Sequence, residues 1–178
     1  MERIVERGDK LPFTCLRCGN CCSSGPNVAL TSFDICRIAK YLGVPWRSLI
    51  GKYVYAVVAD AIPVPLLAGI GGKCVFLKEA KNSTSCSIYP ARPMRCRLFP
   101  FLPRGPSDVN KLELSSICPG VGVGKPVNPP WEELEKFSKE SKLHYEYLFK
   151  HIFQEGLNPV DALEKTIDEL CEAFNNQL

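Results

Sequence analysis

The stretch Cys15-Leu16-Arg17-Cys18-Gly19-Asn20-Cys21-Cys22 places four cysteines within eight residues. Two successive C-x2-C spacings end in a second, adjacent cysteine. A tight C-x2-C turn lets two thiolates reach one metal, and Gly19 and Asn20 are residue types that permit the positive φ such a turn needs. The stretch therefore predicts a metal-binding loop.

Four further cysteines extend this pattern along the chain. They are Cys74, Cys86, Cys96 and Cys118. Eight thiols can fill two four-thiolate sites, and we expect all eight sulfurs to converge. The tandem spacing, the adjacent pair and the remote cysteines favour metal binding over disulfides and over a packed or redox-labile set of thiols.

The adjacent pair suggests how the ligands divide. Successive side chains diverge in a relaxed backbone, so we expect Cys21 and Cys22 to serve different sites. The first set is Cys15, Cys18, Cys21 and Cys118, and the second is Cys22, Cys74, Cys86 and Cys96. The first set fits a ferredoxin-type run completed by a remote Cys-Pro, which favours a [4Fe–4S] cluster, with zinc as the alternative.

Basic side chains accompany these cysteines. Each four-thiolate centre carries a net charge of about −2. Arg92, Arg95 and Arg97 lie around Cys96, Arg17 lies within the first stretch, and Lys73 precedes Cys74. We interpret them as cofactor-binding residues that neutralise charge and donate to sulfur, the alternative being that they are merely solvated. The Arg92 guanidinium should face the cluster or carbonyls of the Cys86–Cys96 loop.

The remaining two cysteines, Cys36 and Cys171, lie among apolar residues of predicted helices. We expect both to be free, buried, small hydrophobic residues. The charged N-terminus lacks a secretory signal, which predicts a cytoplasmic protein whose thiols stay reduced, hyperthermophile cytosol being the exception. The apolar stretch 54–72 contains Pro63 and Pro65, so we expect no membrane helix. A net charge of +3 in 178 residues argues neither for nor against a nucleic-acid partner, and we expect none.

The sequence predicts an α+β fold: a small cysteine-rich domain of short strands and long loops over residues 1–128, and a helical hairpin packed on it over 129–178. Thr31 with Asp34 forms a capping box for the first helix, which ends at Gly43. Arg3–Glu6 reads as a strand, and residues 53–79 read as short strands.

The middle of the chain is expected to form a pair of strands followed by a long loop. Residues 73–77 are expected to pair with 85–89. Residues 90–130 carry nine prolines, and we expect a loop there that is held by metal ligation. In the hairpin, Asn158 should cap a last helix with one apolar stripe, which is formed by Val160, Leu163, Ile167, Leu170, Cys171 and Phe174. His144 and His151 should be packing or surface residues.

The cysteine set as a whole resembles a known family. Its motifs are Cys15-x2-Cys18-x2-Cys21-Cys22, Cys74-Val-Phe-Leu, Cys86-Ser-Ile-Tyr-Pro-Ala-Arg-Pro-Met-Arg-Cys96-Arg-Leu-Phe-Pro, and Cys118. They resemble the YkgJ-type CxxCxxCC cysteine-cluster family of zinc- or iron-chelating proteins, which is related to flagellin lysine N-methylases. The resemblance covers roughly residues 12–124.

The resemblance implies metal binding by these eight cysteines. It also leaves three functions open: a module with a structural or redox role, an enzyme that modifies lysines of a protein substrate, and a metal-handling protein. The glycine-rich segments 69–72 and 120–124 lack the βαβ context of a nucleotide site. No residue is therefore assigned a catalytic role, and metal ions are the expected partners, beside a protein partner or substrate.

Overall fold

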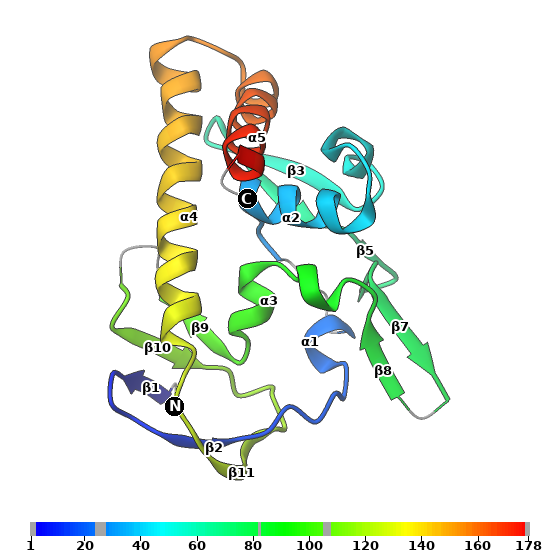
Figure 1. Cartoon of the computed structure of the whole chain (residues 1–178), viewed down its shortest axis with the longest axis vertical. Helices are drawn as coiled ribbons and strands as arrows, with labels where there is room; N and C mark the ends of the chain where they lie inside the picture. Colours follow the sequence, from blue (N-terminus) through cyan, green and yellow to red (C-terminus); the bar gives the residue numbers. More distant parts are fainter. Residues whose placement is uncertain (1–2, 24–27, 82, 105–107, 177–178) are drawn as a thin grey trace.

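The computed structural model describes residues 3–23, 28–81, 83–104 and 108–176, and it is an α+β protein in which several small antiparallel sheets accompany short helices and two long helices near the C-terminus (Figure 1). The helices are α1 Asn20–Ser23, α2 Ser32–Leu42, η1 Trp46–Leu49, η2 Tyr89–Ala91, α3 Met94–Leu98, α4 Trp131–Phe149, the π-helical η3 Lys150–Gln154 and α5 Pro159–Asn176. None of the described helices is long and apolar enough to cross a membrane.

The strands form one three-stranded sheet and several two-stranded ones. They are β1 Arg3–Glu6, β2 Leu11–Phe13, β3 Val54–Ala59, β4 Ile62–Leu67, β5 Gly69–Ile70, β6 Lys73–Cys74, β7 Leu77–Ala80, β8 Ser83–Cys86, β9 Phe101–Pro103, β10 Lys111–Leu114 and β11 Val121–Val127. The larger sheet has the order β1-β10-β9, and the pairs are β2 with β11, β3 with β4, β5 with β6, and β7 with β8.

The first long helix forms as predicted. The Thr31 side chain accepts a hydrogen bond from the Asp34 backbone N–H, and the Asp34 carboxylate accepts one from the Thr31 backbone, which completes the capping box of α2. Gly43 ends the helix in the left-handed conformation, with φ of 67°. The prediction of a strand at Arg3–Glu6 is also confirmed.

The strand expected at 73–77 is divided in the structure. Cys74 ends β6, which pairs with β5, whereas Leu77 begins β7 and faces Cys86 of β8. The expected partner, 85–89, is replaced by β8 and the following turn. The two-residue shift places Cys74 and Cys86 at the same end of the β7–β8 hairpin, towards α3.

The C-terminal helices form a hairpin whose apolar sides fill two separate clusters. Asn158 caps α5, because its Oδ1 accepts from the N–H groups of Val160 and Asp161. The predicted stripe of α5 is buried at Leu163, Ile167 and Leu170, but Val160 is 57% exposed. The division of the chain at residues 128 and 129 stays a prediction.

The first apolar cluster lies between α2, α5 and the β3–β4 hairpin. Its buried members are Leu30, Ile35, Ile38, Ala39, Trp46, Leu49, Val54, Leu67, Phe76, Ile88, Ala91, Leu148, Ala162, Leu163 and Ile167. Phe76 and Ile88 bring this core to within two residues of Cys74 and Cys86 along the chain. The metal-binding motifs are therefore anchored in packed structure.

The second cluster shows that residues 90–130 are not the loop that was predicted, whereas their stabilisation by metal stays a prediction. It consists of Val5, Leu11, Met94, Leu98, Phe101, Leu112, Leu114, Leu134 and Phe137. This segment contains α3 and strands β9, β10 and β11, and the fully buried Met94, Leu98 and Leu112 pack below α4. Pro93, Pro100, Pro103 and Pro130 lie at the ends of these elements, where a missing N–H is tolerated.

A buried ionic network joins the helices around α3. Arg37 of α2 donates to both carboxylate oxygens of Glu140 of α4, at 2.6 and 2.8 Å, and to Asp34 at 2.5 Å. The same Asp34 oxygen accepts the N–H of Met94, the first residue of α3, at 2.9 Å. Burial alone would lower the pKa of Arg37, but the hydrogen bonds and charges of Glu140 and Asp34 raise it.

Cys36 and Cys171 are joined in a disulfide, so the prediction that they are free is wrong. They face each other from α2 and α5 with a Cα–Cα distance of 5.4 Å, which lies in the range that a disulfide spans. Two helices that are far apart in sequence are thereby linked across the first cluster.

We expect the C36A/C171A double variant to lose about 2–4 kcal/mol of unfolding free energy, because the disulfide closes a loop of 135 residues. Urea unfolding at equal metal content measures the loss. Unchanged stability of the variant would show that the helix packing alone determines the α2–α5 interface.

The His144 imidazole is buried, and its environment predicts a pH-dependent stability. Burial lowers its pKa to about 4 from an ordinary 6.5. As the pH falls, the unfolded chain therefore binds this proton before the folded chain does. We expect unfolding free energy to fall by about 3 kcal/mol between pH 6.5 and 4.

Replacing His144 with Asn should flatten the pH dependence in that window. The matched control is Ser32→Ala, which removes the hydroxyl 2.9 Å from His144 Nδ1 but leaves the imidazole buried. That control should be less stable yet keep the slope. Denaturant titrations from pH 7 to 4 provide the measurement, and equal slopes in wild type and the Asn variant would contradict the assignment.

Candidate metal centre

A cavity of about 520 Å³ lies between α1, the β7–β8 hairpin and α3. Six of the eight motif cysteines line it: Cys15, Cys21, Cys22, Cys74, Cys86 and Cys96. Arg17, Arg92 and Arg95 also line it, and the described lining contains no Asp, Glu, Lys or His. The cavity therefore combines sulfur ligands with positive charge.

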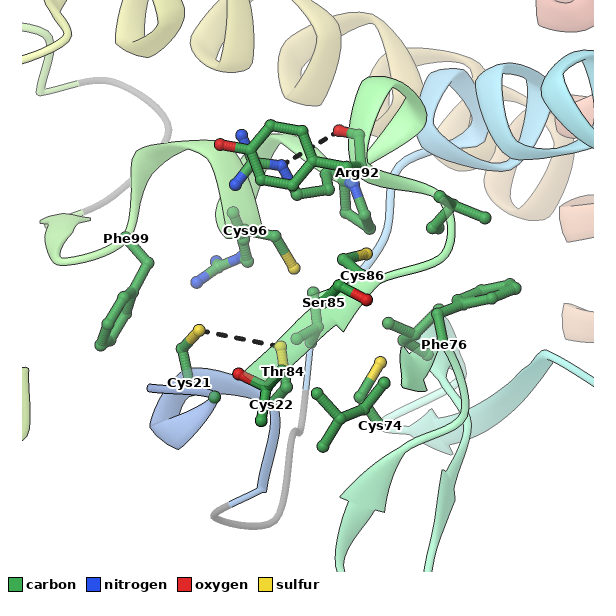
Figure 2. A pocket seen from close by; sticks show the side chains of 18 of the residues that line it. Cys21, Cys22, Cys74, Phe76, Thr84, Ser85, Cys86, Arg92, Cys96 and Phe99 are labelled. Atoms are coloured by element: carbon green, nitrogen blue, oxygen red, sulfur yellow. Dashed lines mark hydrogen bonds between the residues drawn. The ribbon is translucent and has the colours of Figure 1, made fainter. Parts of the chain in front are cut away.

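The cysteines come from separate segments that converge. Cys21 and Cys22 lie in α1, Cys74 ends β6, Cys86 ends β8, and Cys96 lies in the middle of α3. Figure 2 shows their side chains around the same space. Because β8 and α3 are attached to different apolar clusters, the site lies where the two halves of the molecule meet.

The divergence predicted for Cys21 and Cys22 is wrong. Their sulfurs are 3.7 Å apart, joined by the dashed line in Figure 2. The two residues occupy one helical turn, in which successive side chains differ by about 100° and can both face the cavity. The hydrogen bond between the sulfurs lowers the pKa of Cys21 and raises the pKa of Cys22.

The thiols on the other elements interact electrostatically across the cavity. Burial raises the pKa of Cys74, Cys86 and Cys96, and neighbouring thiolates raise the pKa of Cys74 and Cys96 further. The Arg92 charge acts in the opposite direction on Cys86. A cation placed among these sulfurs would relieve the repulsion that their ionised forms create.

Cys18 and Cys118 do not line the cavity, so the expected convergence of all eight sulfurs is only partly observed. Cys15 and Cys18 are exposed, and Cys118 is half-buried. The backbone nevertheless brings Cys15 and Cys118 to the same edge, since the Thr14 N–H donates to the Gly120 carbonyl at 3.1 Å. Within the described residues, no group of three or more candidate ligands has the spacing of a metal site.

The loop that carries the first cysteines is attached to β8 by a residue that sequence reasoning missed. Thr84 Oγ1 donates to the Arg17 carbonyl at 2.5 Å. A Cβ at Gly19 would lie 3.0 Å from that hydroxyl, so only glycine allows this approach. Positive φ occurs at Arg17 and Gly19, whereas the expected Asn20 begins α1. No motif marks Thr84 in the sequence.

Of the three arginines around Cys96, Arg92 and Arg95 line the cavity and Arg97 does not. Arg92 Nε donates to the Tyr89 carbonyl at 3.1 Å, and its guanidinium carbon lies 3.7 Å from the Tyr89 ring centroid (Figure 2). This is the contact with the Cys86–Cys96 loop that was expected. Arg95 also lines the cavity and lies over the Phe137 ring.

Arg97 is not among the lining residues. It donates to the carbonyls of Arg92 and Pro90, so it holds the backbone of the turn. Burial lowers the pKa of Arg97, and the charges of Arg37 and Arg92 lower it further. Lys73, expected beside the cluster, instead pairs with Glu79 at 2.7 Å.

Comparison with known proteins adds to this geometry. The profile of the CxxCxxCC family, described as "Putative zinc- or iron-chelating domain", matches residues 14–119. The chain belongs to this family. The match begins just before Cys15 and ends just after Cys118, so it contains every cysteine around the cavity and excludes α4 and α5.

A curated relative gives no further assignment. An uncharacterized protein of Methanocaldococcus jannaschii is 36% identical over 91 residues. The match covers 51% of this chain and 46% of the relative, so the chain spans about half the length of that protein. No solved structure matches the chain.

Replacing Thr84 with Val should weaken metal binding by roughly fivefold, because the first cysteine loop loses one hydrogen bond of about 1 kcal/mol. Thr84→Ser is the matched control, since it keeps the hydroxyl and should bind nearly as wild type does. Competition with a chelator on the reduced protein measures both. Equal affinities for the Val and Ser variants would show that the loop is positioned without Thr84.

Proposed function

We propose that this protein holds an iron–sulfur cluster, with zinc as the alternative, through the thiolates of Cys22, Cys74, Cys86 and Cys96, in a structural or redox role. The observation that carries the proposal is the cavity whose lining combines cysteines from four segments with three arginines. An all-thiolate donor set suits both Zn²⁺ and [4Fe–4S] clusters. When bound, the cluster would supply a one-electron redox centre.

The size of the cavity favours a cluster over a single ion. One water molecule takes up about 30 Å³ of the liquid, and a metal ion needs no more. An eight-atom iron–sulfur core, at roughly one water volume per atom, would take up about 240 Å³. The cavity of about 520 Å³ accommodates either, but zinc would leave most of it for other occupants.

The chain's own residues supply the rest of the centre. Burial of Cys74, Cys86 and Cys96 removes water from the sulfurs, and Arg92 and Arg95 place positive charge beside them. Asp34 fixes the start of the helix that carries Cys96. These features support a centre that is oriented and electrostatically compensated.

The remaining motif cysteines, Cys15, Cys18, Cys21 and Cys118, are proposed as ligands of a second centre, which would adjoin the first because Cys15 and Cys21 also line the cavity. The exposure of Cys15 and Cys18 favours a second candidate function, metal handling, because exposed thiols can exchange metal with a partner. The unbridged motif thiols support a reducing compartment such as the cytoplasm, and the buried Cys36–Cys171 pair is the exception.

Anaerobic purification followed by iron, sulfide and zinc analysis tests the proposal. We expect about four iron and four sulfide per inner centre, together with an absorption band near 400 nm that dithionite bleaches. Serine variants of Cys74, Cys86 and Cys96 should lose this centre, whereas the C36A/C171A variant is the matched control and should keep it.

The outcomes separate the alternatives. Stoichiometric zinc without sulfide would replace the iron–sulfur assignment by zinc. Metal that a weak chelator removes within minutes would favour metal handling. Full metal content in the Cys74, Cys86 and Cys96 variants would refute this ligand set.

A further inference from the structure

We propose that the same cavity binds a small organic acid beside the metal centre, with the carboxylate on Arg92 and the apolar body against Phe99 and Leu102. The proposal rests on the proposed function only in that the thiols and their metal take up the other part of the cavity. Its own support is the position of Arg92, the shape of the lining and the charge of the site.

Tyr89 holds the Arg92 guanidinium in an orientation that suits carboxylate binding. Nε donates to the Tyr89 carbonyl, and the Tyr89 ring covers one face of the guanidinium. In the described parts of the chain, neither terminal nitrogen of Arg92 has a hydrogen-bond partner in the structure, and no sulfur accepts from it. A guanidinium whose orientation is fixed and whose terminal nitrogens remain available matches the two oxygens of a carboxylate.

The cavity has space beside the thiols for the apolar body of such an acid. In Figure 2, Phe99 lies at one end of the cavity, and Cys74 and Phe76 lie at the other. Phe99 and Leu102 are half-buried and line the cavity, so they offer apolar surface at its mouth. With a cluster of about 240 Å³ in place, roughly half of the cavity would remain, which suits a small ligand.

The charge of the cavity lining favours an anionic ligand. The described lining residues include three arginines and no carboxylate, so an anion meets no acidic side chain there. The adjacent thiolate centre is itself negative by about two charges. A monoanion is therefore favoured over a doubly charged phosphate, which the centre would repel more strongly.

The test uses the full, metal-loaded chain and the probe 3-(4-fluorophenyl)propanoate, followed by fluorine NMR. We expect saturable binding with a dissociation constant of about 1 mM or below. The uncharged 3-(4-fluorophenyl)propanamide should bind at least tenfold more weakly, because it loses the charge-assisted hydrogen bonds. Inorganic phosphate should not displace the probe at equal concentration.

Variants then locate the site. Arg92→Gln should weaken binding at least tenfold, and Arg92→Lys should weaken it by an intermediate factor because the planar fork is lost. The matched control is Arg3→Gln, an exposed arginine on β1, which should bind as wild type does. Phe99→Ala leaves every cysteine and arginine in place and should weaken binding several-fold.

Metal analysis of each sample separates this inference from the proposed function. If Arg92→Gln loses its metal, Phe99→Ala decides the question. Unchanged probe affinity in Phe99→Ala, or in a metal-retaining Arg92→Gln, overturns the inference. Displacement of the probe by phosphate, or equal binding of acid and amide, overturns the carboxylate assignment. Absence of metal with normal probe binding refutes only the metal centre.

Discussion

The rest of the structure depends on one buried carboxylate, that of Asp34, which is 1% exposed. It accepts hydrogen bonds from the Thr31 backbone at the start of α2, from the Arg37 guanidinium and from the Met94 N–H. Removing this carboxylate would leave these donors unpaired. Arg37 links it to Glu140 of α4, and the Met94 N–H fixes the start of α3. A buried charge is tolerated only when paired in this way, so three helices are held in one arrangement.

This arrangement places Cys96 opposite the β7–β8 hairpin. Phe76 and Ile88 hold the hairpin side to the first apolar cluster, while Met94 and Leu98 hold α3 to the second. The cavity is thus the space that remains between elements attached to two different apolar clusters. The short cysteine loop closes it from a third side and is attached mainly through Thr84.

Local patterns in the sequence were sufficient for some of these features. The Thr31–Asp34 capping box, the Asn158 cap and the strand at Arg3–Glu6 involve neighbours in the chain, and each is found where it was expected. The second apolar cluster was missed because Met94 and Leu98 pack against Leu134 and Phe137, which follow about 40 residues later in the chain and are neighbours only in the folded structure. The Cys36–Cys171 pairing and the role of Thr84 likewise depend on contacts between distant segments. The two sulfurs of Cys21 and Cys22 are close because both residues lie in α1. A helix of four residues is too short to show a repeating apolar pattern in the sequence.

Helix α4 contributes to both apolar clusters, with Leu148 in the first and Leu134 and Phe137 in the second, and this has a consequence for the order of events during synthesis. Every motif cysteine lies before residue 119, so all eight are synthesised before α4. Until α4 is made, Met94 and Leu98 of α3, the helix that carries Cys96, lack the Leu134 and Phe137 side chains against which they pack. A nascent chain therefore carries its motif thiols without their final surroundings for the time needed to translate α4. Metal delivery by a carrier that recognises the finished fold would come only after that interval.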